Sequence, residues 1–381
     1  MTLPENAFDA DAILDGILEW AAVESPCHHL AGVNNMMDLA AGEMEALGAE
    51  VERLAGLGGM GDCIVGRLAG SGNSDTPGIL VLSHLDTVHE VGTLDERLPI
   101  RREGDRAYGP GVLDMKGGAR LGIEAMKALQ GHARSSKLPV TFMFTPDEEV
   151  GSPSSRERIE AEAQKHRYIL VPEPLRPWGA IVTGRHAVQR FAVRTHGRPS
   201  HAGLTKAQGR SAIAEMARLI VRIEEMNDYD REVTYSVGTV HGGTFVNVVA
   251  VDAQAEALCI APSAALLEEV RTNMQALAGE ADGVRIEIEQ GLVRPVAEQH
   301  PKTMALYEIA KGLAAEIGLE LEQCRSGGGS DGNFTGALGI ATLDGLGVAG
   351  AGAHTFEEHL LISSLVPRCR LLAALLETLD E

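Results

Sequence analysis

The chain of 381 residues is poor in cysteine, in positive charge and in long apolar runs. Its five cysteines are scattered and form no C-x-x-C pair, so the sequence indicates neither a disulfide framework nor a thiolate zinc site. With 33 Lys and Arg against 54 Asp and Glu, the net charge of −21 disfavours nucleic-acid binding, which depends on clustered cations. No apolar run has the length of a membrane span, and the first residues lack the pattern of a signal peptide. We therefore expect a cytoplasmic protein that binds neither membranes nor nucleic acids.

The sequence has instead the composition and periodicity of a globular α/β protein. Hydrophobic residues make up 44% of it, enough for a core, and the length suggests more than one domain. Apolar segments that begin near residues 78 and 138 have the composition of buried strands, and a helical pattern lies between them near residues 116–130. This alternation predicts a mainly parallel sheet flanked by helices.

The pattern changes at about residue 180. Residues 180–295 combine strand-like segments with amphipathic helices and predict a separate α+β unit. Beyond residue 296 the chain returns to helix, glycine-rich loop and strand. The simplest architecture is a discontinuous catalytic domain, residues 1–179 and 296–381, into which a smaller domain of residues 180–295 is inserted.

Four motifs with acidic or histidine side chains follow predicted strands, where open α/β sheets gather their ligands. In the first motif, His84 and Asp86 lie two residues apart after an apolar strand, so they would face the same side. His84 could then bind a metal ion while Asp86 orients its ring. In the second motif, Asp114 lies in a glycine-rich loop and could bridge two ions.

Two further motifs and a late histidine complete the candidate site. Glu148 and Glu149 follow another predicted strand, and neighbouring side chains on an extended stretch point apart, so one could bind metal while the other transfers a proton. Glu173 lies between two prolines at a third strand end. Three carboxylates and two imidazoles suit zinc, with cobalt or manganese as alternatives. The candidate ligands are His84, Asp114, Glu149, Glu173 and His354.

Taken together, the motifs resemble those of a family of dinuclear zinc enzymes. The chain contains, in order, HLDTV, YGPGVLDMKGG, PDEEVGS, PEP, RPSHAG, GGGSDGN and HTFEEH. This series is similar to that of the family of glutamate carboxypeptidase, aminoacylase, acetylornithine deacetylase and succinyl-diaminopimelate desuccinylase, and it looks closest to the glutamate carboxypeptidase branch. The resemblance implies a zinc exopeptidase-like catalytic domain, and it makes residues 180–295 a lid and dimerisation domain of a homodimer.

The resemblance also implies how two divalent metal ions, most simply Zn²⁺, would be held. Asp114 would bridge them. His84 and Glu173 would complete the ligands of one ion, and Glu149 and His354 those of the other.

Further residues receive roles from the same resemblance. Glu148 would be the general base acting on a water molecule shared by the metal ions, and Asp86 would orient the first histidine ligand. His201 would reach the active site of the partner subunit. Asn247 and Arg294 would bind the carboxylate of the substrate.

The expected reaction is hydrolysis of an amide bond in an N-acyl amino acid or a C-terminal, glutamate-type amino-acid conjugate. One departure concerns the substrate, because many relatives end the strand after Asn247 with Asp-x-Arg, where this chain has Leu258-Cys259-Ile260. A carboxylate-binding arginine is therefore missing from that strand. Glu173 is commonly aspartate in the aminopeptidase branch, so its presence favours release of a C-terminal residue or an acyl group.

Two alternatives stay open. Ser330 lies in a G-x-S-x-G motif and is followed by Asp344 and His354, the residue order of an α/β-hydrolase triad, which would indicate a serine hydrolase. The segment before Ser330 is a poor buried strand, however, and this interpretation leaves the acidic motifs unexplained. The other alternative is a family member whose chemistry has changed to deamination or to hydrolysis of carbamoyl amino acids.

Overall fold

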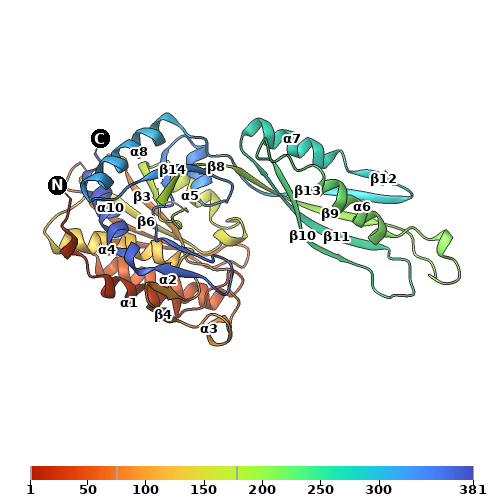
Figure 1. The fold of residues 1–381 in the computed structure, drawn as a ribbon, viewed down its shortest axis with the longest axis horizontal. Helices are drawn as coiled ribbons and strands as arrows, with labels where there is room; N and C mark the ends of the chain where they lie inside the picture. Colours follow the sequence, from red (N-terminus) through yellow and green to blue (C-terminus); the bar gives the residue numbers. More distant parts are fainter. Residues whose placement is uncertain (1, 74–75, 177–178, 381) are drawn as a thin grey trace. The chain divides into compact units, whose positions relative to one another are not determined.

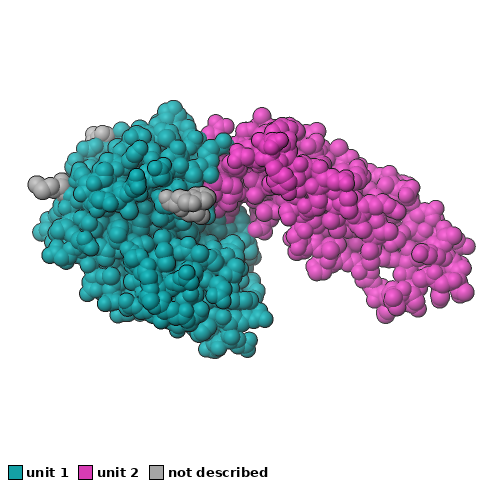
Figure 2. Space-filling view, in the orientation of Figure 1, with its two compact units in different colours: residues 1–184, 299–325, 330–381 teal, residues 185–298, 326–329 magenta. Residues whose placement is uncertain are grey.

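The computed structural model of the protein describes residues 2–73, 76–176 and 179–380. Within them the chain forms two compact units, which Figure 2 distinguishes by colour. Unit 1 comprises residues 1–184, 299–325 and 330–381, and unit 2 comprises residues 185–298 and 326–329. The role of residues 180–295 as a lid and dimerisation domain stays a prediction.

The described residues of unit 1 build an eight-stranded, mainly parallel sheet (Figure 1). The strands lie in the order β1 (Glu50–Leu54), β2 (Cys63–Leu68), β6 (Val140–Thr145), β3 (Gly78–His84), β7 (His166–Val171), β15 (Ala341–Asp344), β8 (Ala180–Arg185) and β14 (Glu322–Ser326). Strands β6, β3, β7 and β15 run parallel, and His84 pairs with Thr145 at the last position of its strand. The segments that follow these strands therefore meet at one edge of the sheet.

The central strands are buried on both faces, which explains why their sequences are apolar without alternation. On β3, Ile79 and Val81 contribute to the larger core, whereas Leu80 and Leu82 contribute to a smaller one. The larger core includes α1 (Ala10–Ala21), α2 (Leu30–Ala46), α4 (Lys116–Gly131), α8 (Pro301–Glu316) and α10 (Leu365–Thr378), and the smaller includes α5 (Arg156–Ala163) and α9 (Gly332–Ala337). This sheet with its flanking helices confirms the predicted α/β fold class.

A small antiparallel sheet in unit 1 joins distant parts of the chain. Its strands lie in the order β16 (Gly350–Ala351), β17 (His359–Leu361), β5 (Arg106–Tyr108) and β4 (Arg101–Glu103). Because His359 pairs with Tyr108, the segment that carries His354 runs beside the loop that carries Asp114. Further short helices among the described residues of unit 1 include η1 (Glu5–Ala7), α3 (Thr93–Glu96), η2 (Glu148–Val150) and η5 (Ile362–Ser364).

Unit 2 has its own antiparallel sheet and core. The strands lie in the order β10 (Thr234–Gly242), β11 (Asp252–Ala261), β9 (Ala187–His196), β13 (Val284–Arg294) and β12 (Gly279–Ala281). On β11 buried and more exposed residues alternate, and the buried ones pack with α6 (Ala212–Glu224) and α7 (Ala264–Gln275). Each helix begins after a serine, Ser211 or Ser263, whose hydroxyl accepts a backbone N–H of the first turn. The turn η4 (Lys206–Gln208) precedes α6.

Over the described parts of the chain, no helix is both long enough and apolar enough to cross a membrane.

Candidate metal centre

Three of the five candidate metal ligands lie at the carboxyl ends of parallel strands of unit 1. His84 is the last residue of β3, and Glu149 and Glu173 follow β6 and β7. Asp114 lies just before α4, and close packing brings that helix to the strand edge. A Cβ on Gly118 would lie 1.7 Å from the carbonyl oxygen of Pro172, so glycine is required where α4 passes the segment of Glu173.

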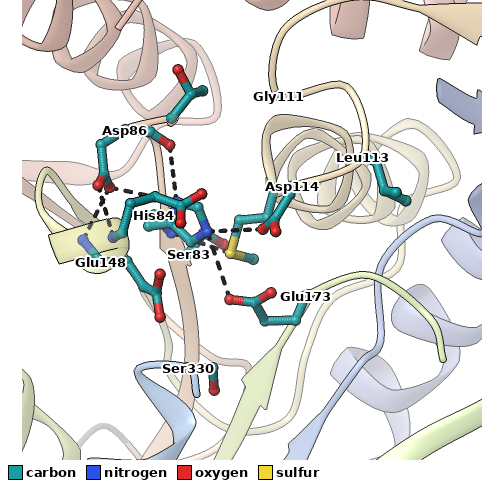
Figure 3. Close-up of polar contacts among 12 residues, drawn as sticks. Ser83, His84, Asp86, Gly111, Leu113, Asp114, Glu148, Glu173 and Ser330 are labelled. Carbon is teal, nitrogen blue, oxygen red and sulfur yellow. Dashed lines mark hydrogen bonds and ion pairs between the residues drawn. The ribbon is translucent and has the colours of Figure 1, made fainter. Parts of the chain in front are cut away.

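The ring of His84 is held in a fixed orientation between these loops (Figure 3). Nδ1 lies 3.0 Å from the backbone carbonyl oxygen of Asp86, which can only accept, so Nδ1 carries a hydrogen. Nε2 lies 3.2 Å from Oδ1 of Asp114 and 3.6 Å from Oε1 of Glu173. A ring nitrogen that faces two carboxylate oxygens in this way is suitably placed to share a cation with them.

Asp114 stands between two groups of candidate ligands. Its Oδ1 faces His84, whereas its Oδ2 lies 3.3 Å from Nε2 of His354. The same His354 nitrogen lies 3.2 Å from Oε2 of Glu149. The ligand atoms of His84, Asp114 and Glu173 lie within 4.8 Å of one another, as do those of Asp114, Glu149 and His354. The two groups share Asp114, which is the arrangement expected of a carboxylate that bridges two ions.

The charge distribution of this cluster is also suited to cations. Hydrogen bonds to Asp114 and Glu149 raise the pKa of His354 to about 11. Burial lowers the pKa of His84, but contacts with Asp114 and Asp86 outweigh it, and its pKa lies well above the usual range. Oε1 of Glu149 is buried and has no hydrogen-bond partner among the described residues. A buried oxygen without a donor is costly unless a cation satisfies it, so the residues present fit a metal centre.

The carboxylate of Asp86 binds the backbone of the two neighbouring glutamates. Oδ1 accepts the N–H of Glu148 at 3.1 Å, and Oδ2 accepts the N–H of Glu149 at 3.0 Å. Oδ2 also accepts the thiol of Cys27 at 2.9 Å, whereas Nδ1 of His84 lies 3.4 Å from Oδ1. Asp86 therefore touches His84 chiefly through its backbone oxygen, and its side chain positions Glu148 and Glu149.

Glu148 and Glu149 lie in a short turn. The sequence predicts an extended stretch here, and this expectation is wrong, because residues 148–150 form the 3-10 helix η2. Asp147 stabilises the turn by accepting the N–H of Ser154 and the hydroxyl of Ser155. Burial raises the pKa of Asp147 to about 6. Both glutamates place a carboxylate oxygen within 4.8 Å of a His84 ring nitrogen.

The remaining predicted site residues lie in unit 2. His201 is exposed, and its Nδ1 accepts the N–H groups of Gly203 and Leu204 at 3.1 and 3.2 Å. Nδ1 is therefore unprotonated, Nε2 carries the hydrogen, and the ring can donate from Nε2. Asn247 lies beside His201, because its carbonyl oxygen accepts the N–H of Ala202.

Arg294 lies at the opposite end of unit 2 from Asn247. Arg294 is buried and pairs with Val188 at the beginning of β9, whereas the segment of Asn247 adjoins the residues that follow β9. The strand between them spans roughly 30 Å at about 3.3 Å per residue. Arg294 and Asn247 of one subunit therefore cannot hold the same carboxylate, and their predicted joint role requires two subunits.

Ser330 has surroundings unlike those of a serine nucleophile. It is fully buried, and its hydroxyl donates directly to Oδ2 of Asp344 at 2.5 Å. In a catalytic triad an imidazole lies between the serine and the acid, but the His354 ring instead contacts Asp114 and Glu149. The geometry gives no support to the serine hydrolase alternative.

Three buried residues of the centre were not predicted from the sequence. Cys27 donates to Asp86, and Lys116 anchors the end of the Asp114 loop by donating to the carbonyl oxygens of Trp20 and Val23. Burial lowers the pKa of Lys116 to about 7. The third residue, Glu358, accepts N–H groups of the Asp114 loop.

The chain is similar to known proteins. Residues 80–378 match the profile described as peptidase family M20/M25/M40. Carboxypeptidase G2 of Pseudomonas sp. (strain RS-16) is 30% identical over 354 residues, which cover 91% of this chain and 83% of that protein. A succinyl-diaminopimelate desuccinylase of Thioalkalivibrio sulfidiphilus is 26% identical over 80% of this chain and 85% of its own length. The fold is similar to that of the M20 family metallo-carboxypeptidase Sso-CP2 from Sulfolobus solfataricus, with a TM-score of 0.76, 17% identity and coverage of 96% and 98% of the two chains.

Proposed function

The chain belongs to peptidase family M20/M25/M40, and from this premise we propose that it hydrolyses the amide bond of an N-acyl amino acid or of a C-terminal, glutamate-type amino-acid conjugate. Membership confirms the resemblance inferred from the motifs and makes the protein a hydrolytic enzyme of the metallo-carboxypeptidase type. The observation that carries the proposal is the pair of ligand groups that share Asp114.

We assign the ligands of two divalent ions to these groups. His84, Asp114 and Glu173 would hold one ion, and Asp114, Glu149 and His354 the other. A donor set of imidazoles and carboxylates suits Zn²⁺, with Co²⁺ or Mn²⁺ as alternatives. When bound, such ions polarise a substrate carbonyl and lower the pKa of a water molecule.

Glu148 is the proposed general base. Its carboxylate belongs to the group formed with His84 and Glu149, and its backbone N–H is fixed by Asp86. From this position it would take a proton from the attacking water and return it to the leaving nitrogen. The Nε2–H of His201 would donate to the oxyanion that develops on the carbonyl oxygen.

We propose that His201 acts in the active site of a partner subunit. Strand β10 lies at an edge of the sheet of unit 2, and an edge strand presents unpaired backbone groups to a second strand. Val240 on this strand and Ile213 and Val221 on α6 are apolar and exposed. A second copy of the chain that pairs with this edge would cover them.

In such a dimer, Asn247 of one subunit and Arg294 of the other could bind the same substrate carboxylate. Asn247 would enter the partner's active site together with the neighbouring His201, whereas Arg294 would act within its own subunit. Arg294 is buried beside the glycine-rich loop at Gly329, and a guanidinium has the donor geometry that suits a carboxylate. This pair would replace the arginine that is missing from β11.

The experiment that tests this function is the substitution Glu148→Gln. The amide keeps the shape of the side chain but cannot take a proton, so the variant should retain its metal and lose hydrolysis of N-acyl amino acids and C-terminal glutamate conjugates. Glu157→Gln, on the exposed surface of α5, is the matched control and should behave as wild type. If Glu148→Gln kept more than a tenth of the wild-type kcat, a loss of less than about 1.4 kcal/mol in barrier, Glu148 would not be the base.

A further inference from the structure

Glu358 lies at a junction of three segments that carry candidate metal ligands. It is only 1% exposed and lies four residues after His354. Its Oε1 accepts the backbone N–H groups of Leu113 at 2.9 Å and Asp114 at 3.1 Å. Its Oε2 accepts the N–H of Gly111 at 3.2 Å. Figure 3 shows the loop of Gly111, Leu113 and Asp114 beside His84 and Glu173.

His89 provides the fourth hydrogen bond to this carboxylate. Its Nε2 lies 2.6 Å from Oε2 of Glu358, and the ring is buried. His89 follows His84 by five residues in the segment after β3. A carboxylate has about four lone-pair sites, so the donors in contact with Glu358 use its whole accepting capacity.

We propose that Glu358, with His89, is a positioning residue that fixes the separation of the two halves of the metal centre. The side chain joins the segment of His354 to the loop of Asp114, and through His89 to the segment of His84. A side chain that holds its ligand-bearing neighbours by hydrogen bonds controls where their ligand atoms lie. This inference rests on the proposed function, because it assumes that these residues bind metal.

The substitution Glu358→Gln halves the hydrogen-bond accepting capacity of this side chain with little change of shape. A glutamine has one oxygen, which can keep the N–H groups of Leu113 and Asp114, but its NH₂ group would then face the N–H of Gly111. That N–H would lose its acceptor in a buried place, and the loop of Asp114 would shift to relieve it. Glu357→Gln makes the same chemical change at the exposed neighbour and is the matched control.

The measurement is titration of the metal-free protein with Co²⁺, followed by visible absorption and by competition with a chelator. Wild type and Glu357→Gln should bind two ions. In Glu358→Gln the ion held by Asp114, Glu149 and His354 should bind about 10- to 100-fold more weakly, the usual effect of losing such a partner. The ion held by His84 and Glu173 should be affected less, because β3 and β7 fix these residues.

A second pair of variants covers the case in which Glu358→Gln does not fold. His89→Ala removes one donor and leaves the three backbone donors in place, so it should weaken the same ion by a smaller factor. His89→Gln retains an N–H donor and should restore part of that affinity, whereas His89→Leu, which restores bulk without a donor, should not.

The outcomes separate the inference from the proposed function. If wild type binds no Co²⁺, the metal centre itself is refuted, and this inference is refuted with it. If wild type binds two ions and folded Glu358→Gln or His89→Ala binds both within twofold of wild type, the proposed function stands and the positioning role is refuted.

Discussion

The substitution Asp86→Asn tests the physical basis of the centre without reference to a substrate. Asp86 is fully buried, and its oxygens accept two backbone N–H groups and the Cys27 thiol. Burial raises the pKa of Asp86, but contacts with His84, Cys27 and the N–H of Glu149 outweigh it, so the pKa lies below its usual value. The fold therefore stabilises the ionised carboxylate, and a neutral amide should be destabilising.

The magnitude follows from counting donors. Asparagine has one oxygen, so the N–H of either Glu148 or Glu149 must face its NH₂ group and lose its acceptor. An unsatisfied buried donor costs about 1–3 kcal/mol, and the remaining bond weakens because its acceptor is no longer charged. Together these effects predict a loss of about 2–4 kcal/mol in the free energy of unfolding of the metal-free protein.

Urea unfolding of wild type and variant in the presence of a chelator measures this loss. Asp38→Asn is the matched control, because Asp38 is largely exposed, and its loss should stay below about 1 kcal/mol. A variant that unfolds within about 0.5 kcal/mol of wild type, and that also binds metal with unchanged affinity, would refute the role given to the Asp86 carboxylate.

Two further predictions concern pH and assembly. Burial raises the pKa of Glu162, but His166 and neighbouring cations outweigh it and lower the pKa to about 2 from 4.5. The stability that this ionised carboxylate contributes is present above pH 4.5 and is lost as the pH falls toward 2. Glu162→Gln should therefore lower the free energy of unfolding by about 1–2 kcal/mol at pH 7. If thermal unfolding showed the same difference from wild type at pH 2, this prediction would be contradicted. Mixing His201→Ala chains with Glu148→Gln chains should restore some activity, because one active site of each mixed dimer has both residues intact. If isolated mixed dimers showed no recovery, His201 would act in its own subunit or outside catalysis.

The sequence predicted the fold class, and it indicated which loops carry the clustered histidine and acidic residues, because both depend on local pattern. Apolar runs without alternation identify strands buried on both faces, and the residues after such strands must lie at the same edge of a parallel sheet. His84, Glu149 and Glu173 follow three of these strands, so their proximity could be expected before the structure was known. Their role as metal ligands stays a proposal that the family membership supports.

Other features depend on contacts between distant residues, and no local pattern indicates them. Glu358 meets His89 across 269 positions, and Cys27 meets Asp86 across 59. The peptide bond between Asp114 and Met115 is cis, although neither residue is proline. The two ends of β9 that separate the predicted substrate-binding residues became apparent only with the strand register of unit 2.

The most direct test of the central claim is the metal content of the chain, measured by elemental analysis of protein purified without chelator. Two ligand groups that share Asp114 predict two divalent ions per chain, most simply zinc. Protein that contains no metal, and that takes up no zinc, cobalt or manganese on titration, would contradict the proposed centre and the hydrolytic mechanism built on it.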